Sequence, residues 1–308
     1  MGARRSFADA FFKSLTFVFA LSIVALTVLF FYLLTKNSEL TLKEGFYFIY
    51  GTKWNGVNVF GALPVIYGSF ITSAIALLLG VPLSLGVAIF LSELSPKLLK
   101  SPIGFVVEML AAVPSVVYGL WGLFVFAPFL TYDVFPTIQR YLGFLPIFSG
   151  SIHGANILDA GIVLAIMITP IVSSISRDAL LAVPDSQREA AYALGATKSE
   201  MIRISVLSYA RSGILASIFL GFGRAFGETI AVTMVVGNVQ IITSSLFSPA
   251  ATLASLIATQ YTEAATPIYT SALVEAGLVL LTVVFLTNFI ARYFIGRLVK
   301  NREAASYI

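Results

Sequence analysis

Six apolar runs, each roughly 20 residues or longer, constrain the fold of this chain more than any other feature. A run of that length crosses the hydrocarbon core of a bilayer as an α-helix. Helix is the expected form because backbone groups in lipid must form their hydrogen bonds within the segment. We therefore predict an all-α membrane protein with a single transmembrane domain over residues 1–308. The predicted spans are about Lys13–Thr35, Val65–Leu91, Ile103–Leu130, Ile157–Ser176, Arg211–Val236 and Ser271–Ile295.

The composition agrees with lipid as the surrounding solvent, since 58% of the residues are hydrophobic and 11% are charged. Soluble domains carry about 25% charged residues. The chain has no cysteine and a single histidine, His153, which excludes thiolate and multi-histidine metal sites and a cysteine nucleophile. A formal charge of +4 is too modest to suggest a nucleic-acid partner. We expect this chain to hold no metal and no cofactor of its own.

The distribution of Lys and Arg predicts the orientation, because cytoplasmic loops carry an excess of basic residues. With the N-terminus inside, fourteen of the 19 basic residues fall in inside loops and tails, four fall outside, and Arg224 lies within a span. Both termini are therefore predicted to be cytoplasmic. The inside residues are Arg4, Arg5, Lys13, Lys97, Lys100, Arg177, Arg188, Lys198, Arg203, Arg211, Arg292, Arg297, Lys300 and Arg302, and the outside residues are Lys36, Lys43, Lys53 and Arg140.

This orientation places residues 177–211 on the cytoplasmic side and residues 36–64, 131–156 and 238–270 outside. The segment 131–156 contains Pro and Gly residues and is expected to be irregular. A short helix from Ala250 to Tyr261 is expected to dip partly into the bundle.

Two of the predicted spans carry a small residue at every fourth position, which places these residues along one side of a helix. Small residues let membrane helices approach closely and gain van der Waals contact. Close packing alone explains the pattern, and sliding of helices during transport is a second interpretation that the residues do not exclude. The two sets are Gly68, Thr72, Ala76, Gly80, Ser84 and Ala88, and Gly213, Ser217, Gly221, Ala225, Thr229 and Thr233.

Ionisable side chains within the predicted spans are candidates for function, because charges in a bilayer are costly and usually face the protein interior or a water-filled path. Asp159, at the start of a span, is expected to have a capping role, and Glu108 is expected to lie within reach of water. Glu275 is a further candidate in the sixth span. Arg224 and Glu228 lie near mid-span, four residues apart, and are predicted to pair on one helix face.

Two interpretations of the Arg224–Glu228 pair follow from the residues. Arg224 keeps its charge in a membrane, and its planar donors match the oxygens of phosphate or carboxylate. The pair then meets an anionic substrate, with Glu228 holding the guanidinium in the absence of substrate. Alternatively, the pair is an internal ion pair that only fixes helix packing.

A polar, charged segment from Asp185 to Arg211 interrupts the apolar sequence. Pro184 and the following Asp185 and Ser186 predict a helix start, with Glu189 placed as in a capping box, and Gly195 predicts its end. The segment is either an amphipathic connector or a docking helix for a cytosolic partner.

Within this segment, Glu189, Ala190, Ala191 and Gly195 match the cytoplasmic-loop motif of the permease subunits of ABC importers, which the chain resembles at these residues. Ser205 and Ser208 stand where that motif has Ile and Pro. The runs Ala111–Gly122, Gly195–Thr197, Ala210–Ile214 and Arg224–Thr229 look like the phosphate-specific (Pst) permeases, and Trp54–Pro64 looks like their C-type subunit. The resemblance extends from about Tyr50 to the end of the sixth span.

The resemblance implies a type I ABC importer permease fold in the cell membrane and a role as the transmembrane subunit of an ATP-driven phosphate importer. The implied partners are a second permease subunit of the A type, two ATPase subunits and an extracytoplasmic phosphate-binding protein. It further implies that Glu189, Ala190, Ala191 and Gly195 couple the chain to the ATPase. It also implies that Arg224 and Glu228, with the adjoining Thr229, lie on the phosphate pathway.

The chain contains no G-x-x-x-x-G-K-[ST] motif, so ATP-Mg is expected on the partner ATPase and this chain is not expected to be an enzyme. Two alternatives stay open. One is an ABC permease for another oxyanion, such as sulfate or molybdate. The other is a secondary transporter or channel that needs no ATPase, against which the polar cytoplasmic segment and the lack of an evident inverted repeat argue.

Overall fold

The computed structural model describes the backbone of residues 2–43 and 45–305 and the side chains of residues 9–43 and 45–297. Arg4, Arg5, Lys300 and Arg302, which enter the charge count above, lie outside the described side chains. Within the described residues the regular structure is helical, with two isolated bridges, Trp54 to Phe60 and Gly237 to Ala250. The α-helices are α1 (Gly2–Asn37), α2 (Glu39–Leu42), α3 (Tyr47–Tyr50), α4 (Leu63–Ile89), α5 (Lys97–Ala112), α6 (Ser115–Trp121), α7 (Ala127–Phe129), α8 (Phe135–Leu142), α9 (Ile157–Leu181), α10 (Asp185–Ala193), α11 (Lys198–Met201), α12 (Leu207–Gly227), α13 (Ile230–Val235), α14 (Leu253–Gln260) and α15 (Pro267–Ala305). Short π-helical turns are η1 (Phe90–Leu94), η2 (Gly122–Phe126), η3 (Leu130–Val134) and η5 (Ile202–Val206), and 3-10 turns are η4 (Pro146–Phe148) and η6 (Tyr261–Glu263).

Six helices among the described residues are long and apolar enough to cross a membrane, as predicted. The first, second, fourth and sixth agree with the predicted spans, with ends a few residues further out. The six are Asp9–Asn37, Leu63–Leu94, Ser115–Leu142, Ile157–Leu181, Lys198–Gly227 and Pro267–Arg297.

The third span differs from the prediction. The predicted helix Ile103–Leu130 is interrupted at Val113, which has an extended backbone (ψ 126°), and the spanning helix is Ser115–Leu142. The residue before a proline is disfavoured in the helical region, so Pro114 ends the helix at this point. Much of the segment 131–156, expected to be irregular, therefore continues the helix through η3 and α8.

The fifth span was also predicted too long at its far end. The helix stops at Gly227 instead of Val236, and a separate short helix, α13, follows after two residues. This interruption lies next to the predicted ion pair and is described below.

Helix α9 forms the centre of the bundle. Its most apolar window is 72% buried, whereas that of α1 is 0% buried. α4 and α12 are its most extensive neighbours. The whole predicted small-residue face of α4, from Gly68 to Ala88, is buried. A Cβ atom added to Gly161 of α9 would lie 2.4 Å from Cγ2 of Ile75, so α4 and α9 pack closely.

The small-residue face of α12 is buried over Ser217, Gly221 and Ala225. The Ser217 hydroxyl lies 2.8 Å from that of Ser176 on α9, a buried hydrogen bond between the two helices. The packing role predicted for both sets of small residues is thus confirmed where the helices meet.

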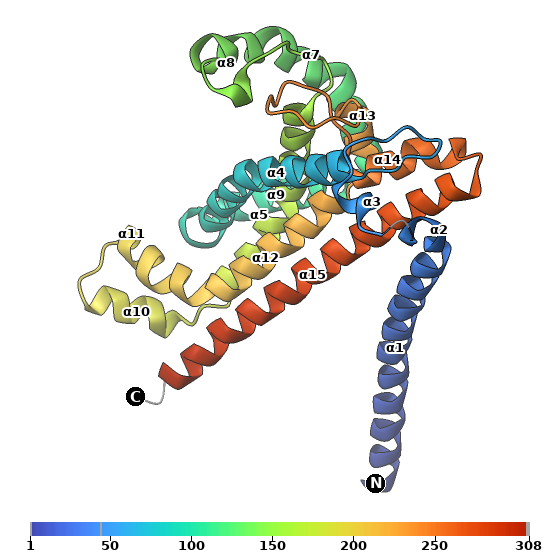
Figure 1. The fold of residues 1–308 in the computed structure, drawn as a ribbon. Coiled ribbons are helices and arrows are strands. Elements are labelled where there is room, and N and C mark those ends of the chain that lie inside the picture. The colour runs from blue at the N-terminus through green and yellow to red at the C-terminus, as the bar shows by residue number, and fades with distance from the viewer. Residues whose placement is uncertain (1, 44, 306–308) are drawn as a thin grey trace.

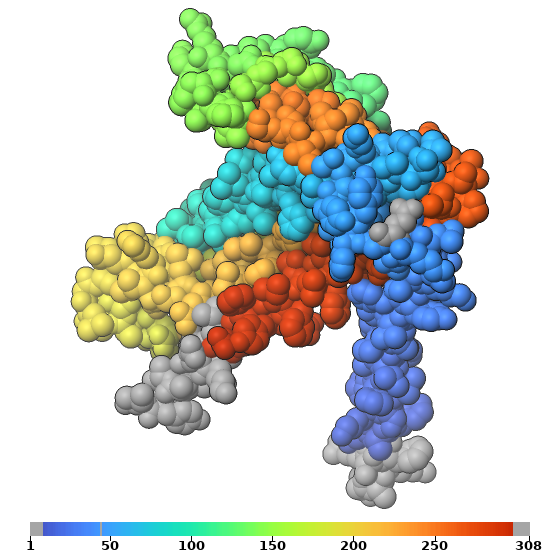
Figure 2. All heavy atoms as spheres, in the orientation of Figure 1, coloured from blue at the N-terminus to red at the C-terminus, as the bar shows by residue number. Residues whose placement is uncertain are grey.

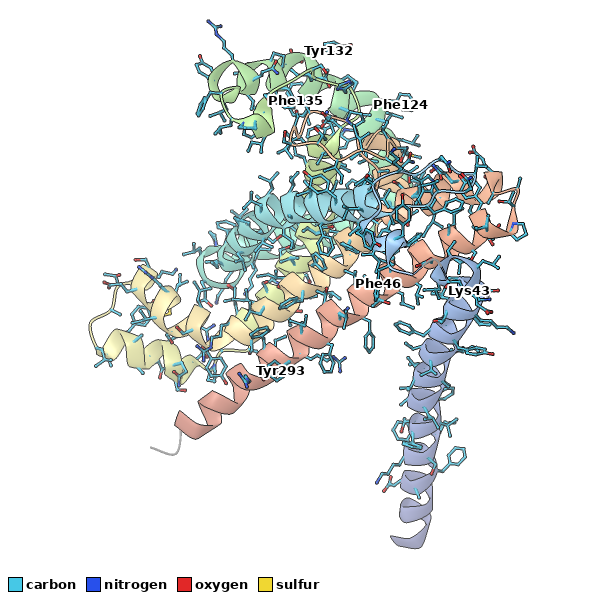
Figure 3. The ribbon with its side chains drawn as sticks, viewed as in Figure 1. Lys43, Phe46, Phe124, Tyr132, Phe135 and Tyr293 are labelled. Carbon is cyan, nitrogen blue, oxygen red and sulfur yellow. The ribbon has the colours of Figure 1, made fainter. Side chains whose placement is uncertain are left out.

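Helix α1 stands apart from the rest of the molecule and meets it near α2 and α15 (Figures 1 and 2). The rings of Phe31 and Phe285 contact edge to face with centroids 5.7 Å apart. The segment holding α7 and α8 projects from the opposite part of the molecule, and its labelled aromatic side chains include the exposed Phe124 and Tyr132 (Figure 3).

The segments at the end of the bundle that holds α14 are tied together by side chains. Gln260 Oε1 accepts hydrogen bonds from Trp54 Nε1 at 2.8 Å and from the Tyr269 hydroxyl at 2.7 Å. The short helix predicted between Ala250 and Tyr261 is present as α14, and its residues Leu253–Leu256 are buried.

Candidate functional site

An ion pair lies at the interruption between α12 and α13. Arg224 belongs to the last turn of α12, and Nη2 of its guanidinium lies 3.6 Å from Oε2 of Glu228. The Glu228 side chain is 7% exposed, whereas that of Arg224 is 46% exposed. The predicted pairing is therefore present, and its two members have unequal access to their surroundings.

The backbone at this position explains the geometry. Glu228 follows the last residue of α12 and has an extended conformation (ψ 126°). The prediction that both residues lie on one continuous helix is therefore wrong. Its carboxylate reaches the start of α13, where Oε1 accepts from the amide of Ala231 at 3.5 Å. The first amides of a helix have no partners within it. Glu228 is thus placed between the guanidinium of Arg224 and the start of α13.

Thr229, the third predicted pathway residue, lies within the interruption. Its hydroxyl donates to the carbonyl of Gly227 at 3.3 Å, and its own carbonyl accepts from the Thr233 hydroxyl at 2.7 Å. Thr229 therefore fixes the local backbone around Glu228. The structure brings all three predicted residues, Arg224, Glu228 and Thr229, to one place.

Other residues of this chain leave open space near Arg224. A Cβ atom added to Gly223 or Gly227 would meet nothing within 4 Å. A guanidinium has five N–H donors, more than the single carboxylate at 3.6 Å can satisfy. The arrangement can therefore accept an oxyanion on the open side of Arg224 while Glu228 holds the other side.

The remaining acidic candidates have structural partners. Asp159 is buried at the start of α9, where Asn156 is the N-cap residue: Asn156 Oδ1 accepts from the Asp159 amide at 2.9 Å and its Nδ2 donates to the Asp159 carboxylate at 2.7 Å. Glu108 pairs with Arg177 at 3.2 Å, and its side chain is 55% exposed. Glu275 is buried in α15. Sequence analysis missed Asn156, although an Asn directly before an apolar helix is a typical N-cap signal.

The second candidate site is the segment around α10. Helix α10 begins at Asp185 and ends at Ala193, and Gly195 follows with a φ of +80°, a conformation that favours glycine. The predicted capping box of Ser186 and Glu189 is wrong, because no side chain caps α10. A capping box is present instead between Thr197 and Glu200, at the start of α11.

The residues of the predicted coupling motif divide between two environments. Ala191 is buried against an apolar cluster that includes Leu180 and Met201, so it holds α10 to the bundle. Glu189, Ala190 and Gly195 are exposed. Leu194, which sequence analysis did not single out, is 88% exposed directly before Gly195. The surface formed by Glu189, Ala190, Leu194 and Gly195 is therefore available to a partner.

Comparison with solved structures supports the fold. The chain superposes on the permease of a bacterial ABC transporter that imports the acidic polysaccharide alginate, with a TM-score of 0.59, 15% identity, and coverage of 94% of this chain and 99% of that chain. A subunit of the MetNI methionine ABC transporter gives a TM-score of 0.54 at 17% identity, with coverage of 77% of this chain and 96% of that chain. The fold is that of a type I ABC importer permease.

Residues 80–300 match the family described as binding-protein-dependent transport system inner membrane component. The phosphate transport system permease protein PstC of Mesorhizobium japonicum is 48% identical over 259 residues, which cover 82% of this chain and 79% of that protein. The protein of the same name from Haemophilus influenzae is 40% identical over 304 residues, covering 97% of this chain and 96% of that protein. This chain belongs to the binding-protein-dependent transport system inner membrane component family. It is a multi-pass membrane subunit of an ABC importer and works with partners of the ATPase and binding-protein types.

Proposed function

We propose that this chain is the C-type permease subunit of an ATP-driven inorganic phosphate importer. It forms the translocation path together with a second permease subunit of the A type. Two ATPase subunits bind and hydrolyse ATP-Mg on the cytoplasmic side, and an extracytoplasmic phosphate-binding protein delivers the substrate. Relatives named as phosphate transport permeases, 40–48% identical over most of the chain, support this choice of substrate.

The observation that carries the proposal is the unequal exposure of Arg224 and Glu228 at the interruption between α12 and α13. Phosphate oxygens accept two hydrogen bonds from one guanidinium, which gives both attraction and orientation. Glu228 competes for the same guanidinium and so lets the anion leave, because an isolated Arg charge would hold it too firmly. The pair thus forms a transient, low-affinity binding site for phosphate along the pathway.

The surface of Glu189, Ala190, Leu194 and Gly195 docks on the cytosolic ATPase in this proposal. Closure of the ATPase on ATP moves α10. The helix bundle then changes between an inward-open and an outward-open conformation. Both termini and α10 lie on the cytoplasmic side, in the orientation that the Lys and Arg distribution predicts.

The pathway role is tested with the complete transporter in liposomes by measuring uptake of radioactive phosphate. Arg224→Gln assembles normally and loses uptake, whereas Arg224→Lys keeps a part of it because the charge is retained. The matched control is Arg211→Gln, an exposed residue of the same helix. Wild-type uptake by Arg224→Gln shows that the pair serves packing alone. Sulfate and molybdate are added as competitors, and inhibition equal to that by unlabelled phosphate refutes selectivity for phosphate over these oxyanions.

The docking role is tested by co-purification with the ATPase. Glu189→Arg and Gly195→Trp abolish co-purification, because the first reverses a surface charge and the second places a large side chain at a positive φ on the docking surface. Glu263→Arg, which changes an exposed acid in η6, is the control. Normal assembly of both α10 variants removes the docking role.

A further inference from the structure

Helix α10 is fastened to the bundle by Arg188, which lies on the face of α10 away from the exposed motif residues. Its guanidinium donates to Glu93 Oε1 at 2.8 Å and to Glu93 Oε2 at 3.4 Å. The side chains are 16% and 7% exposed, so the pair is largely withdrawn from water. Glu93 precedes Arg188 by 95 positions, so this bond joins parts of the chain that no local pattern connects.

The same guanidinium also binds the end of α9. Nη2 donates to the carbonyl of Leu180 at 3.0 Å, and Nη1 donates to the carbonyl of Val183. Carbonyls in the last turn of a helix have no partner within it. Asp185 adds an exposed contact at 3.2 Å. Arg188 therefore joins three elements: α10, the end of α9, and the turn that follows α4.

Glu93 lies in η1, the π-helical turn at the end of α4. A second π-helical turn, η5, leads from α11 into α12, and there the Ser205 hydroxyl donates to the carbonyl of Gln187 in α10 at 2.8 Å. π-helical turns are rare and occur frequently at functional sites. Helix α10 is thus linked by a charged pair to one π-helical turn and by a neutral hydrogen bond to another.

We propose that the Arg188–Glu93 pair is the joint that transmits displacement of α10 to α4, so that the two helices move as one body during transport. This inference rests on the proposed docking of α10 on the ATPase. Arg188 and Glu93 are positioning residues here, since neither contacts phosphate. The buried faces of α4 and α9 carry small residues, so motion received at Glu93 passes along α4 into the centre of the bundle.

The alternative is a pair that only stabilises the fold. A buried ion pair adds little to stability compared with apolar side chains of similar volume. Replacing both members with apolar residues therefore preserves folding and removes the directional bond. The apolar double variant therefore separates a role of the pair in transmitting motion from a role in stabilising the fold.

The experiment uses the assembled transporter in liposomes with ATP and phosphate, and measures the ATP hydrolysed per phosphate imported. Glu93→Gln, Arg188→Gln and the double variant Glu93→Leu/Arg188→Met are compared with Glu108→Gln. The control removes the charge from another Arg–Glu pair, that of Arg177 and Glu108, which does not involve α10. We expect assembly and ATP hydrolysis to persist in all variants, with the ratio raised by about tenfold when the pair is removed.

A ratio equal to that of wild type in Glu93→Gln, or in the apolar double variant if Glu93→Gln does not assemble, overturns the inference.

Spin labels separate this inference from the proposed function, and the chain has no cysteine that would interfere. Labels at the exposed positions Ser186 and Leu83 report the distance between α10 and α4, and a label at Phe289 serves as the reference on α15. We expect the α10–α4 distance to stay constant on ATP addition in the wild type and to change in Glu93→Gln. Absence of any α10 movement in the wild type refutes the docking of α10. Movement of α10 with a constant α10–α4 distance in Glu93→Gln refutes only the joint.

Discussion

The close packing at the start of α4 gives a prediction whose size follows from the structure. A Cβ atom added to Gly68 would lie 2.1 Å from the carbonyl oxygen of Ala251. Carbon and oxygen atoms in weak contact stay about 3.3 Å apart or more, so Gly68→Ala forces the two segments apart by about 1 Å. Overpacking of this kind costs about 1–3 kcal/mol.

The adjacent hydrogen bond adds to this cost. The amide of Leu253 donates to the hydroxyl of Ser69 at 2.9 Å, and both groups are buried. Displacing α4 lengthens this bond, and loss of a buried bond costs about 1–3 kcal/mol. We expect Gly68→Ala to lower the free energy of unfolding by about 2–6 kcal/mol.

Gly86 provides the matched control on the same helix. It is exposed, and a Cβ atom there would meet nothing within 4 Å. Alanine is favoured over glycine inside a helix by about 0.5–1 kcal/mol, so Gly86→Ala leaves the stability unchanged or raises it. Thermal unfolding of the purified chain in detergent, followed by circular dichroism, compares the two variants. Equal melting temperatures refute the contact between α4 and Ala251.

Further predictions concern the ends of the bundle. Asn156→Ala removes the buried N-cap of α9 and lowers the free energy of unfolding by about 1–2 kcal/mol; chemical denaturation measures it, and Asn156→Ser restores part of the loss. Gln260→Leu leaves the donors of Trp54 and Tyr269 without their acceptor, so limited proteolysis cuts residues 52–60 faster, whereas an unchanged rate contradicts the role of Gln260. Lys43→Ala leaves the melting temperature unchanged because its pair with Glu39 is about two-thirds exposed. In the wild type, the hydrogen bond from Lys43 and its positive charge lower the pKa of Glu39. Lys43→Ala therefore raises this pKa, and carbon NMR titration measures the rise.

The helices and their packing faces could be predicted because both depend on local pattern. Apolar runs set the number of spans, and small residues at every fourth position identified the buried face of α4. The break at Val113 had a local signal in Pro114, but the apolar run extends across it, so hydropathy could not decide which part crosses the membrane. Gly227 is only a weak local signal for the end of a helix. The carboxylate of Glu228 contacts both Arg224 and the start of α13, and no local pattern predicts that it joins the two helices at the break.

Contacts between distant segments could not be predicted. Arg188 was counted as one of the basic residues that set the orientation, and its bond to Glu93 arises only because α4 and α9 end side by side. Asn156 had a recognisable signal, whereas Leu194 had none, because the exposure of a Leu directly after a helix depends on how that helix is docked.

The functional candidates lie in different places relative to the core, and this allows effects on transport to be distinguished from effects on stability. The core surrounds α9, which is 72% buried in its most apolar window, and Gly68 and Asn156 lie within that core. Arg224 and the exposed residues of α10 lie at its margins, where a side chain can change without opening a cavity. Substitutions in the core should therefore lower stability and transport together, whereas substitutions at the margins should lower transport at unchanged stability. A variant of Arg224 that loses both in proportion would place that residue in the packing of the bundle and not on the path of the anion.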